Sequence, residues 1–538
     1  MAELPDNPIG AAWLMAHCDI NPMARLPVIS RWGGRRATEV VDGYRLETYP
    51  DSMRPANNIA AHLQFHLRHE VPQLEFLARL FGQLGPVSVQ DWIDAEPTGQ
   101  YARRAAFLYE WLTGNALRVP DRTGGNYVDV LDDSKMVTAS PDCIVKNPRW
   151  RVNDNLPGTR YFCPSLVKTP SFMHAIALDV SRLFADLTAE FGEDLLMRAA
   201  AWMTLRESRA SFAIEGEADR LTRIQRFADV LARRTAQGEQ PLTDRAVAEL
   251  QREILGERTT LAHFGFRQSP VFVGETVRFN EIVHYVAPTQ DDVPAMLDGL
   301  RVFLQRTAGQ SPVMRSAVAA FGFVYIHPLA DGNGRVHRFL INDVLRRDGV
   351  IPEPVILPIS AVIMDDAGER RGYDKVLDHV SAPLMANVRE NVSFAAAQTT
   401  YPDGVVSNFA FDGEQLARPL WRYPDLSPHV QYLANIVKRT LTEHMREESR
   451  YLRSHARARQ AIKEIVEMPD HQADRLLRSI EQNRGQLSNV LAKEMPVLQQ
   501  PGIWPAIVDA VSSALRDDDS TDPALVDRYR PERPAGQP

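Results

Sequence analysis

The chain has 538 residues, which at about 150 residues per domain corresponds to three or four folding units. Hydrophobic residues make up 44% of the chain and charged residues 24%, and this ordinary usage excludes a wholly disordered chain, a collagen and a coiled-coil fibre. The formal net charge is -8, so the overall balance does not predict nucleic-acid binding, although a local basic surface stays open.

Cysteine usage and the first residues indicate a reducing compartment. Cys18, Cys143 and Cys163 are too few to cross-link a chain of this length, and we expect Cys143 and Cys163 to be small buried side chains. The amino terminus carries acidic residues where a signal peptide needs positive charge, and no run of about 18 uninterrupted apolar residues follows. We therefore expect a cytoplasmic protein that neither spans nor crosses a membrane.

Residues 1–165 predict a helical module whose role the sequence does not indicate. Helical periodicity covers Ile59 to Phe81 and Tyr101 to Leu112, and Arg103 and Arg104 are expected on the solvent side of the second helix. Turn residues separate two short β-like runs, which predict a small hairpin at 127–131 and 136–139.

A long helical region follows and is interrupted by one hairpin. Apolar residues recur at helical spacing from Pro170 to Glu215. β-Branched and aromatic residues at 265–286, among them Phe279, predict a lone hairpin that turns at Gly274. Two further periodic segments, Ser311 to Ile326 and Gly334 to Arg347, are separated by a short polar loop.

The carboxy-terminal part reads as a connector, a helical unit and a tail. Residues 391–426 are rich in Pro, Gly and Asp and predict a connector, and helical periodicity returns over 427–515. A turn at 483–485 between helical segments allows a DNA-binding helix-turn-helix, although the pattern favours a solvated basic face that docks on neighbouring helices. Residues 516–538 are polar and proline-rich, which predicts disorder.

The polar loop gathers the residue types of a phosphate site. Its sequence is His327-Pro-Leu-Ala-Asp-Gly-Asn-Gly-Arg-Val-His-Arg338. Gly332 and Gly334 let the backbone approach a ligand closely, and the helix that starts here favours an anion at its amino end. Arg335 and Arg338 lie three residues apart on the first helical turn, where two guanidinium groups can hold two phosphate groups.

Two other side chains of the loop suit a reaction at phosphorus. Asp331 can hold Mg²⁺, which prefers one or two carboxylates together with substrate oxygens. His327 follows the preceding helix, and its reference pKa of about 6.5 suits a general base that takes a proton from an attacking hydroxyl. The alternative is a plain turn with Asn333 as helix cap, which explains the glycines but not the converging His, Asp and Arg side chains.

These twelve residues resemble the Fic-family motif H-x-F-x-(D/E)-G-N-G-R-x-x-R, with seven of its eight defining positions kept. Leu329 stands where the family usually has Phe, as a hydrophobic anchor under the loop. The resemblance implies a mainly α protein with a helical Fic catalytic domain at 166–390 and a β-hairpin flap. It also implies transfer of AMP from ATP to a Tyr, Thr or Ser hydroxyl of a target protein, with His327 as base and Asn333 orienting phosphate oxygens.

Three further segments resemble parts of that family's site. Residues 283–288 resemble the flap hairpin, which holds a target segment by strand addition, and we expect His284 and Tyr285 to contact the nucleotide. Residues 357–360 and 373–377 resemble the helices that close the adenine pocket.

A built-in inhibitor is implied by a segment upstream of the loop. Ser211-Phe-Ala-Ile-Glu215-Gly216 reads by itself as a helix end with a glycine cap. It resembles the family's inhibitory helix motif, (S/T)-x-x-x-E-(G/N), which implies that Glu215 pairs with Arg338 while Ser211 anchors the helix. An occupied Arg338 cannot bind the γ-phosphate, so the resting enzyme should be weak.

Several alternatives stay open. The chain can be a related transferase that moves another phosphate-containing group, an enzyme that removes AMP, or a non-catalytic nucleotide sensor whose carboxy-terminal unit binds DNA or a protein. The sequence does not identify the target and leaves a homodimer open. His62, His66, His69 and Glu70 have helical spacing, which allows a metal site, but they are more typical of the polar edge of an amphipathic helix.

Overall fold

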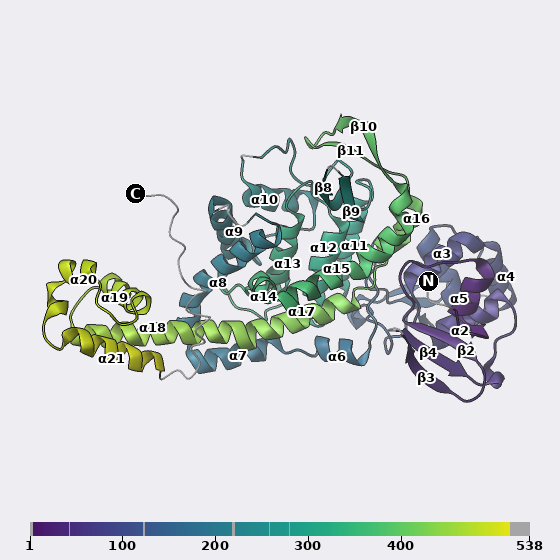
Figure 1. Ribbon diagram of the computed structural model, residues 1–538. Coiled ribbons are helices and arrows are strands. Elements are labelled where there is room, and N and C mark those ends of the chain that lie inside the picture. The colour runs from purple at the N-terminus through teal and green to yellow at the C-terminus, as the bar shows by residue number, and fades with distance from the viewer. Residues whose placement is uncertain are drawn as a thin grey trace. The chain divides into compact units, whose positions relative to one another are not determined.

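The computed structural model describes residues 4–41, 44–121, 124–217, 221–257, 259–278 and 280–516. Helices dominate these ranges and the sheets are small, so the protein is mainly α, as predicted (Figure 1). Contacts divide the chain into two units, one of Met1–Leu178 with Leu205–Val437 and the other of Asp179–Thr204 with Lys438–Pro538. The five segments expected from the sequence pattern stay a prediction.

No helix in the ranges just given combines the length and the apolar character that crossing a bilayer requires.

The first unit begins with a mixed α/β region whose four-stranded sheet the sequence pattern did not predict. Its four-stranded sheet has the order β1-β2-β4-β3, with β2 parallel to β4 and antiparallel pairing elsewhere. The predicted helix at 59–81 is two helices, because Pro72 lacks the N–H that a continuous helix needs. The elements are β1 Pro8–Ile9, α1 Ala11–Cys18, β2 Val28–Trp32, β3 Ala37–Val41, β4 Tyr44–Tyr49, α2 Ile59–His69, α3 Leu74–Leu84, α4 Val87–Ala95 and α5 Gln100–Thr113.

The predicted hairpin at 127–131 and 136–139 is wrong. Residues of the first run form β5, which pairs in parallel with β7 in a three-stranded sheet of order β5-β7-β6. Met136 instead bridges Val167. The β-like runs were too short to specify a partner, so more distant residues decided the pairing. The strands are β5 Val128–Asp129, β6 Val145–Asn147 and β7 Val152–Asp154.

The expectation that Arg103 and Arg104 face solvent is also wrong. Their exposed fractions are 2% and 8%. Arg104 donates to the carbonyls of Val130 and Leu67, and Arg103 donates to backbone carbonyls that include that of Trp150. Buried carbonyls need donors, and these two guanidinium groups supply them for the irregular segments beside α5.

His62 and His66 of α2 are buried parts of the fold and not the polar edge that the sequence favoured, whereas His69 is only partly buried. The Gly10 amide donates to His62, the Ala11 amide donates to Glu70, and His66 lies 2.7 Å from the same carboxylate. Burial lowers the pKa of His62 to about 4. In the described ranges no three His, Cys, Asp or Glu side chains gather to hold a metal ion. The contacts fix the start of α1 on α2.

The two cysteines that were expected to be buried differ in exposure. Cys163 is buried as expected, whereas Cys143 is partly exposed.

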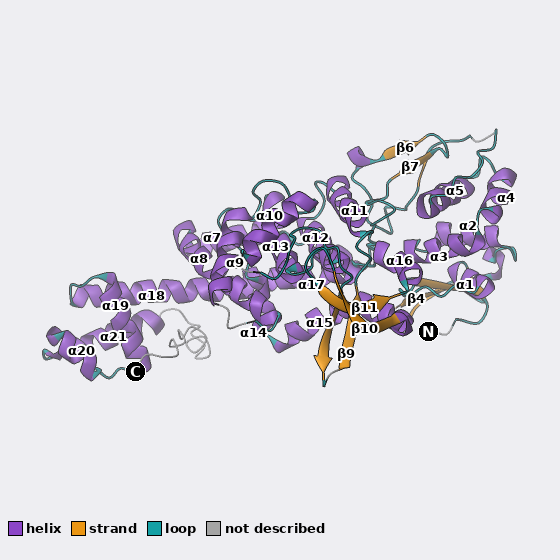
Figure 2. Ribbon diagram, turned by 90° about the horizontal axis from the view of Figure 1, so that it is seen from above, coloured by secondary structure: helices purple, strands orange, loops and turns teal. Residues whose placement is uncertain are grey.

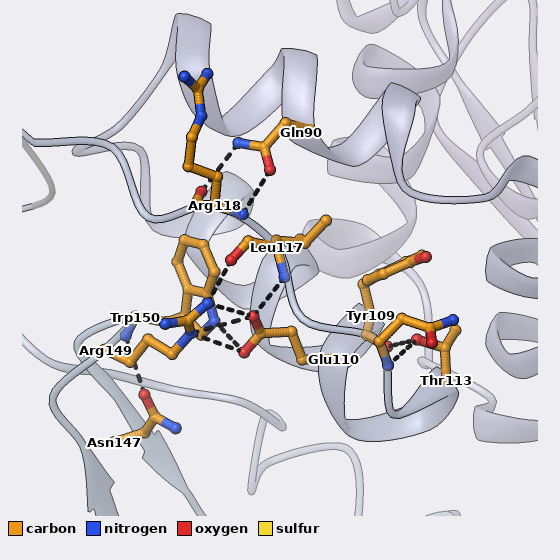
Figure 3. A network of polar contacts seen from close by, with 10 residues as sticks. Gln90, Tyr109, Glu110, Thr113, Leu117, Arg118, Asn147, Arg149 and Trp150 are labelled. Carbon is orange, nitrogen blue, oxygen red and sulfur yellow. Dashed lines mark hydrogen bonds and ion pairs between the residues drawn. The ribbon is translucent and has the colours of Figure 1, made fainter.

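A polar network around Glu110 joins α5 to the segments on either side of it (Figure 3). The carboxylate accepts hydrogen bonds from the Trp150 indole at 2.7 Å and from the Leu117 amide at 2.8 Å. Arg149 forms an ion pair with the same group at 2.9 Å. Because one carboxylate satisfies all three donors, this region depends on Glu110.

Replacing Glu110 by alanine should lower the free energy of unfolding by about 2–3 kcal/mol, since the Trp150 indole and the Leu117 amide lose their acceptor. Urea denaturation followed by tryptophan fluorescence measures the loss. Asp94→Ala is the control, because it breaks an ion pair with an exposed Arg118 that should contribute less than about 1 kcal/mol. Equal losses would contradict the assignment.

The rest of the first unit is a helical domain built around α12 and α13, which are buried along almost their whole length. Both helices were predicted, at 311–326 and 334–347. The helix predicted from Pro170 to Glu215 is three helices, α6 to α8, of which only part belongs to this unit. The helices are α6 Pro170–Ile176, α8 Glu193–Ile214, α9 Leu221–Arg234, α10 Asp244–Leu255, α11 Val293–Arg306, α12 Pro312–Ile326, α13 Asn333–Arg347, α14 Ile359–Asp365, α15 Ala367–Val388, α16 Glu414–Arg422 and α17 Ser427–Arg439.

Two antiparallel hairpins flank this domain and lie side by side in both views (Figure 1, Figure 2). The first, β8 Phe272–Val277 with β9 Asn280–Val286, was predicted, but it does not turn at Gly274. Gly274 lies inside β8 at a register shift, where a Cβ atom would lie 2.2 Å from the Ile282 carbonyl oxygen. Phe279 lies outside the described residues.

The second hairpin, β10 Val392–Thr400 with β11 Val406–Phe411, occupies the segment that was expected to be a connector. That segment also contains α16. Most of the Pro, Gly and Asp residues of this segment fall in the turns between these short elements, although Pro419 lies inside α16.

The second unit is helical. A π-helical turn at Thr440–His444 leads into α18, and apolar side chains of α18, α19 and α21 share a core that includes Ile462, Leu476 and Ile507. Some basic side chains of α18 form ion pairs, such as Arg446 with Glu190 and Lys463 with Asp470. DNA binding by α19 and α20 stays a prediction, and residues 517–538 of the predicted tail lie outside the described ranges. The further helices are α7 Val180–Phe191, α18 Met445–Ile465, α19 Asp470–Gln482, α20 Asn489–Glu494 and α21 Ile503–Arg516.

Candidate active site

The loop between α12 and α13 starts with His327 in a left-handed backbone conformation, with φ 51° and ψ 56°. Such a conformation costs a residue other than glycine about 1–3 kcal/mol. The His327 amide donates to the Phe323 carbonyl at 2.9 Å, which caps α12. The left-handed backbone at this residue ends α12 and turns the chain into the loop that leads to α13.

The imidazole of His327 has the tautomer that a base needs. Its Nδ1 atom lies 3.1 Å from the Val324 carbonyl oxygen and donates to it, so Nε2 carries the lone pair. Burial and the cationic Arg267 lower the pKa of His327 to about 4. The ring is therefore neutral at physiological pH and can accept a proton.

Asn333 fastens the loop to itself. Its Oδ1 accepts from the Leu329 amide at 3.0 Å, and its Nδ2 donates to the Leu329 carbonyl at 2.7 Å. The predicted use of this side chain to orient phosphate oxygens is therefore not what the structure shows. Leu329 itself is fully buried and serves as the anchor expected for this position.

Glu215 lies between the two arginines of α13. Its carboxylate forms an ion pair with Arg338, and its other oxygen lies 3.2 Å from Nε of Arg335. Arg338 also donates from Nε to the Ser211 hydroxyl at 2.6 Å. The structure thus brings together Ser211, Glu215 and Arg338, and it adds Arg335, which the sequence analysis had not connected with Glu215.

The Glu215 carboxylate occupies the amino end of α13, where a helix favours an anion. A Cβ atom at Gly334 would lie 2.4 Å from the Glu215 oxygen, so only glycine lets the carboxylate come this close. Gly332 precedes it with φ 95° as the helix cap. The two glycines therefore form the cradle that was predicted for an anion, and a carboxylate of the same chain lies in it.

Glu207 is a further site residue that the sequence analysis missed. It lies four residues before Ser211, on the same face of α8, and is fully buried. The Ser360 amide and hydroxyl donate to its carboxylate at 2.6 Å and 2.5 Å. The spacing of four residues between Glu207 and Ser211 is the only sequence feature that could have indicated that Glu207 faces the site. Glu207 thus fixes α8 to the start of α14.

Glu207→Gln should remove a pH dependence of stability. Burial raises the pKa of Glu207 from 4.5 to about 7. The folded protein therefore binds the proton more tightly, and the group's contribution to stability is lost as the pH rises from about 4.5 to about 7, by roughly 3 kcal/mol. Glutamine resembles the protonated acid, so the variant's unfolding free energy should stay flat across this window. Urea denaturation at pH 5 and pH 8 measures both proteins, and parallel declines would contradict the assignment.

A cavity of about 370 Å³ opens beside the loop and has a volume in the range of ligand sites. Asp331 lines it with a half-exposed carboxylate, which accepts from Arg335 at 2.9 Å. One carboxylate next to an arginine suited to phosphate fits Mg²⁺, whose other ligands would be substrate oxygens and water. Arg223 was not predicted. The lining residues are Arg223, Leu255, Thr259, Thr260, Asp331 and Arg335.

The two residues of the first hairpin that were expected to contact the nucleotide, His284 and Tyr285, differ in exposure. His284 has a side chain that is 55% exposed and lies 3.6 Å from Glu275. Tyr285 is buried, and its hydroxyl donates to the Tyr325 carbonyl at 2.7 Å. The expected nucleotide contact from the Tyr285 side chain is therefore not what the structure shows, because its hydroxyl is used inside the domain. Tyr373, expected near an adenine pocket, is also buried.

The fold is a helical domain in which the Glu215 carboxylate lies at the start of α13. The loop before this helix begins at His327, whose ring is neutral at physiological pH. Residues 241–345 match the family model described as "Fic/DOC family". Residues 241–345 are therefore similar to the Fic/DOC family.

Curated relatives agree with this assignment over a limited stretch. "Protein adenylyltransferase Fic" of Drosophila ananassae is 32% identical over 119 residues, and that of Drosophila willistoni is 33% identical over 119 residues. These stretches cover 22% of this chain and 22% of each relative, so the chain spans about a fifth of the length of the relatives it matches. A solved structure, a Fic family protein from Desulfovibrio desulfuricans G20, is 19% identical with a TM-score of 0.38, covering 56% of this chain and 82% of that one.

Proposed function

We propose that the chain is a self-inhibited protein adenylyltransferase that moves AMP from ATP to a Tyr, Thr or Ser hydroxyl of a protein target. The observation that carries the proposal is the Glu215 carboxylate, held by Arg335 and Arg338 at the start of α13 next to His327. A carboxylate in an anion cradle marks the place that phosphate would take. The relatives are named as protein adenylyltransferases, which supports AMP as the transferred group.

The reaction uses His327 as its base. The target's hydroxyl oxygen attacks the α-phosphorus, the bond from that phosphorus to pyrophosphate breaks, and the hydroxyl proton passes to Nε2 of His327. The Nδ1–H group of the neutral imidazole donates to the Val324 carbonyl, so Nε2 is free to accept the proton. Amides at the start of α13 stabilise charge on the phosphate oxygens, so positioning and electrostatics provide most of the rate.

The remaining residues bind the triphosphate. Arg338 would hold the γ-phosphate and Arg335 the β-phosphate once Glu215 has left. Asp331 would hold Mg²⁺, which supplies positive charge between phosphate groups. A cytoplasmic location stays part of the proposal on the cysteine usage alone, and so does a homodimer.

ATP labelled at different phosphorus atoms tests the reaction. Protein carrying Glu215→Gly is incubated with Mg²⁺ and ATP labelled on the α- or the γ-phosphorus, with a cell lysate as source of targets. We expect label on protein from the α-position only, and weaker labelling by the unmodified chain. Label from the γ-position would indicate a kinase, and tight ATP binding without any label would indicate a nucleotide sensor.

A further inference from the structure

Arg267 is a buried cation that contacts the candidate base from outside the loop. It is 2% exposed, and its Nε atom donates to the carbonyl oxygen of His327 at 2.7 Å. Its own amide donates to the Pro328 carbonyl at 2.8 Å. Two successive carbonyls of the strained loop start are therefore satisfied by one residue.

The same guanidinium reaches the end of the first hairpin. It donates to the Ser269 carbonyl at 2.8 Å and to the Pro288 carbonyl. Burial lowers the pKa of Arg267 to about 10, so the group stays charged at neutral pH. A buried charge needs polar partners, and the carbonyls that Arg267 holds include that of His327.

Asp403, at the tip of the second hairpin, holds the segment that carries Arg267. It is 1% exposed, and its Oδ2 accepts from the Gln268 amide and the Ser269 hydroxyl, both at 2.8 Å. The Ala262 amide donates to the Asp403 carbonyl at 2.9 Å. The carboxylate also favours the charged form of Arg267. Asp403 therefore holds both ends of the segment 262–269, while Gln251 and Asp244 of α10 accept from the amides of Gly265 and Phe266 in its middle.

The tip can approach because of Gly404. Its φ is 86°, and a Cβ atom there would lie 2.8 Å from the Ala262 amide. At the other end of the hairpin, Phe394 and Phe409 pack on Phe272 of β8, with ring centroids 5.5 Å and 4.9 Å away. The second hairpin is thus attached to both the first hairpin and the segment 262–269.

We propose that the hairpin at 392–411 positions the base of the reaction, through Asp403, which fixes Arg267, which in turn holds the carbonyl of His327. This inference rests on the proposed function. The hairpin lies outside the family-matched residues 241–345, so a residue of an accessory element supports the reacting group. Asp403 and Arg267 act as positioning residues and touch no substrate.

Asp403→Asn tests the proposal in protein that carries Glu215→Gly. Asparagine keeps the size of the side chain but loses a full acceptor charge at Ser269 and beside Arg267. We expect kcat for AMP transfer to fall by about tenfold to a hundredfold, while the ATP dissociation constant from calorimetry stays within about twofold. Asp412→Asn is the matched control and should leave kcat unchanged, because Asp412 is exposed, directly follows the hairpin and accepts from Asn391.

Two Arg267 variants separate its charge from its geometry. Because the Arg267 cation lowers the pKa of His327, Arg267→Gln should raise that pKa. Arg267→Lys keeps the charge but not the planar fork, so kcat should fall while the pKa stays low. NMR titration of histidines labelled at Cε1 reads the pKa, with His327→Ala to assign the signal among the 14 histidines.

The NMR spectra decide the proposal even if no transfer is detected. Asp403→Asn should move the His327 signal and Asp412→Asn should not. Absence of transfer by Glu215→Gly protein would remove the proposed function but leave this comparison in place. The positioning role is overturned if Asp403→Asn keeps both the His327 signal and, where transfer occurs, the parent rate, or if both aspartate variants change them equally.

Discussion

Protein that carries both His327→Ala and Glu215→Gly is expected to transfer AMP at least about a hundredfold more slowly than protein with Glu215→Gly alone. Alanine removes the Nε2 lone pair that accepts the hydroxyl proton, while the cradle at the start of α13 keeps its arginines. Initial rates with ATP labelled on the α-phosphorus measure the loss, because the product keeps that label.

Binding and pH dependence complete this test. Calorimetry should give the same ATP dissociation constant for both proteins, since His327 is not expected to hold the nucleotide. Because its pKa is lowered to about 4 and only the neutral ring acts as a base, the Glu215→Gly rate should lose activity only as the pH falls toward 4. Full activity without the imidazole would contradict the assignment.

Glu215→Gly should raise transfer by roughly a hundredfold over the unmodified chain. A buried ion pair broken from one side costs about 3–5 kcal/mol, and ATP must overcome the pairing of Glu215 with Arg338 and Arg335 before its phosphates can bind. With every 1.4 kcal/mol worth about tenfold, the lower end of this range corresponds to about a hundredfold, and we expect the lower end because the Glu215 side chain is 24% exposed. Self-labelling and lysate labelling with α-labelled ATP measure it.

Two controls separate charge from flexibility. Glu215→Gln keeps the shape without the charge and should activate partly. Glu217→Gly introduces the same glycine two residues later, where the glutamate pairs with Arg223 at 3.4 Å, and should leave transfer low. If Glu217→Gly activates as strongly as Glu215→Gly, then a loosened chain end explains the effect and the pairing with Arg338 does not.

The loop and its two helices could be predicted because their information is local. The glycines, His327, Asp331 and the two arginines lie within twelve consecutive residues, and α12 and α13 have strong apolar periodicity. The contact of Glu215 with Arg338 came from a resemblance, since 123 residues separate the two and no physical rule joins such positions.

The wrong predictions share a physical cause, which is partners distant in sequence. Arg103 and Arg104 read as solvated charges because the carbonyls that bury them lie mostly 23 to 48 residues away. Asp403 lay in an expected connector, and its contact with Ser269 spans 134 residues.

The position of Glu215 relative to α8 determines how inhibition can end. The helix stops at Ile214, so Glu215 belongs to a turn whose amides donate to Phe212 and Ala213. Ser211 and Glu207 lie inside the regular helix and keep their contacts with Arg338 and Ser360. If Glu215 inhibits as proposed, its release from Arg338 needs a rearrangement of only a few backbone torsions at the helix terminus, and the regular part of α8 can stay folded.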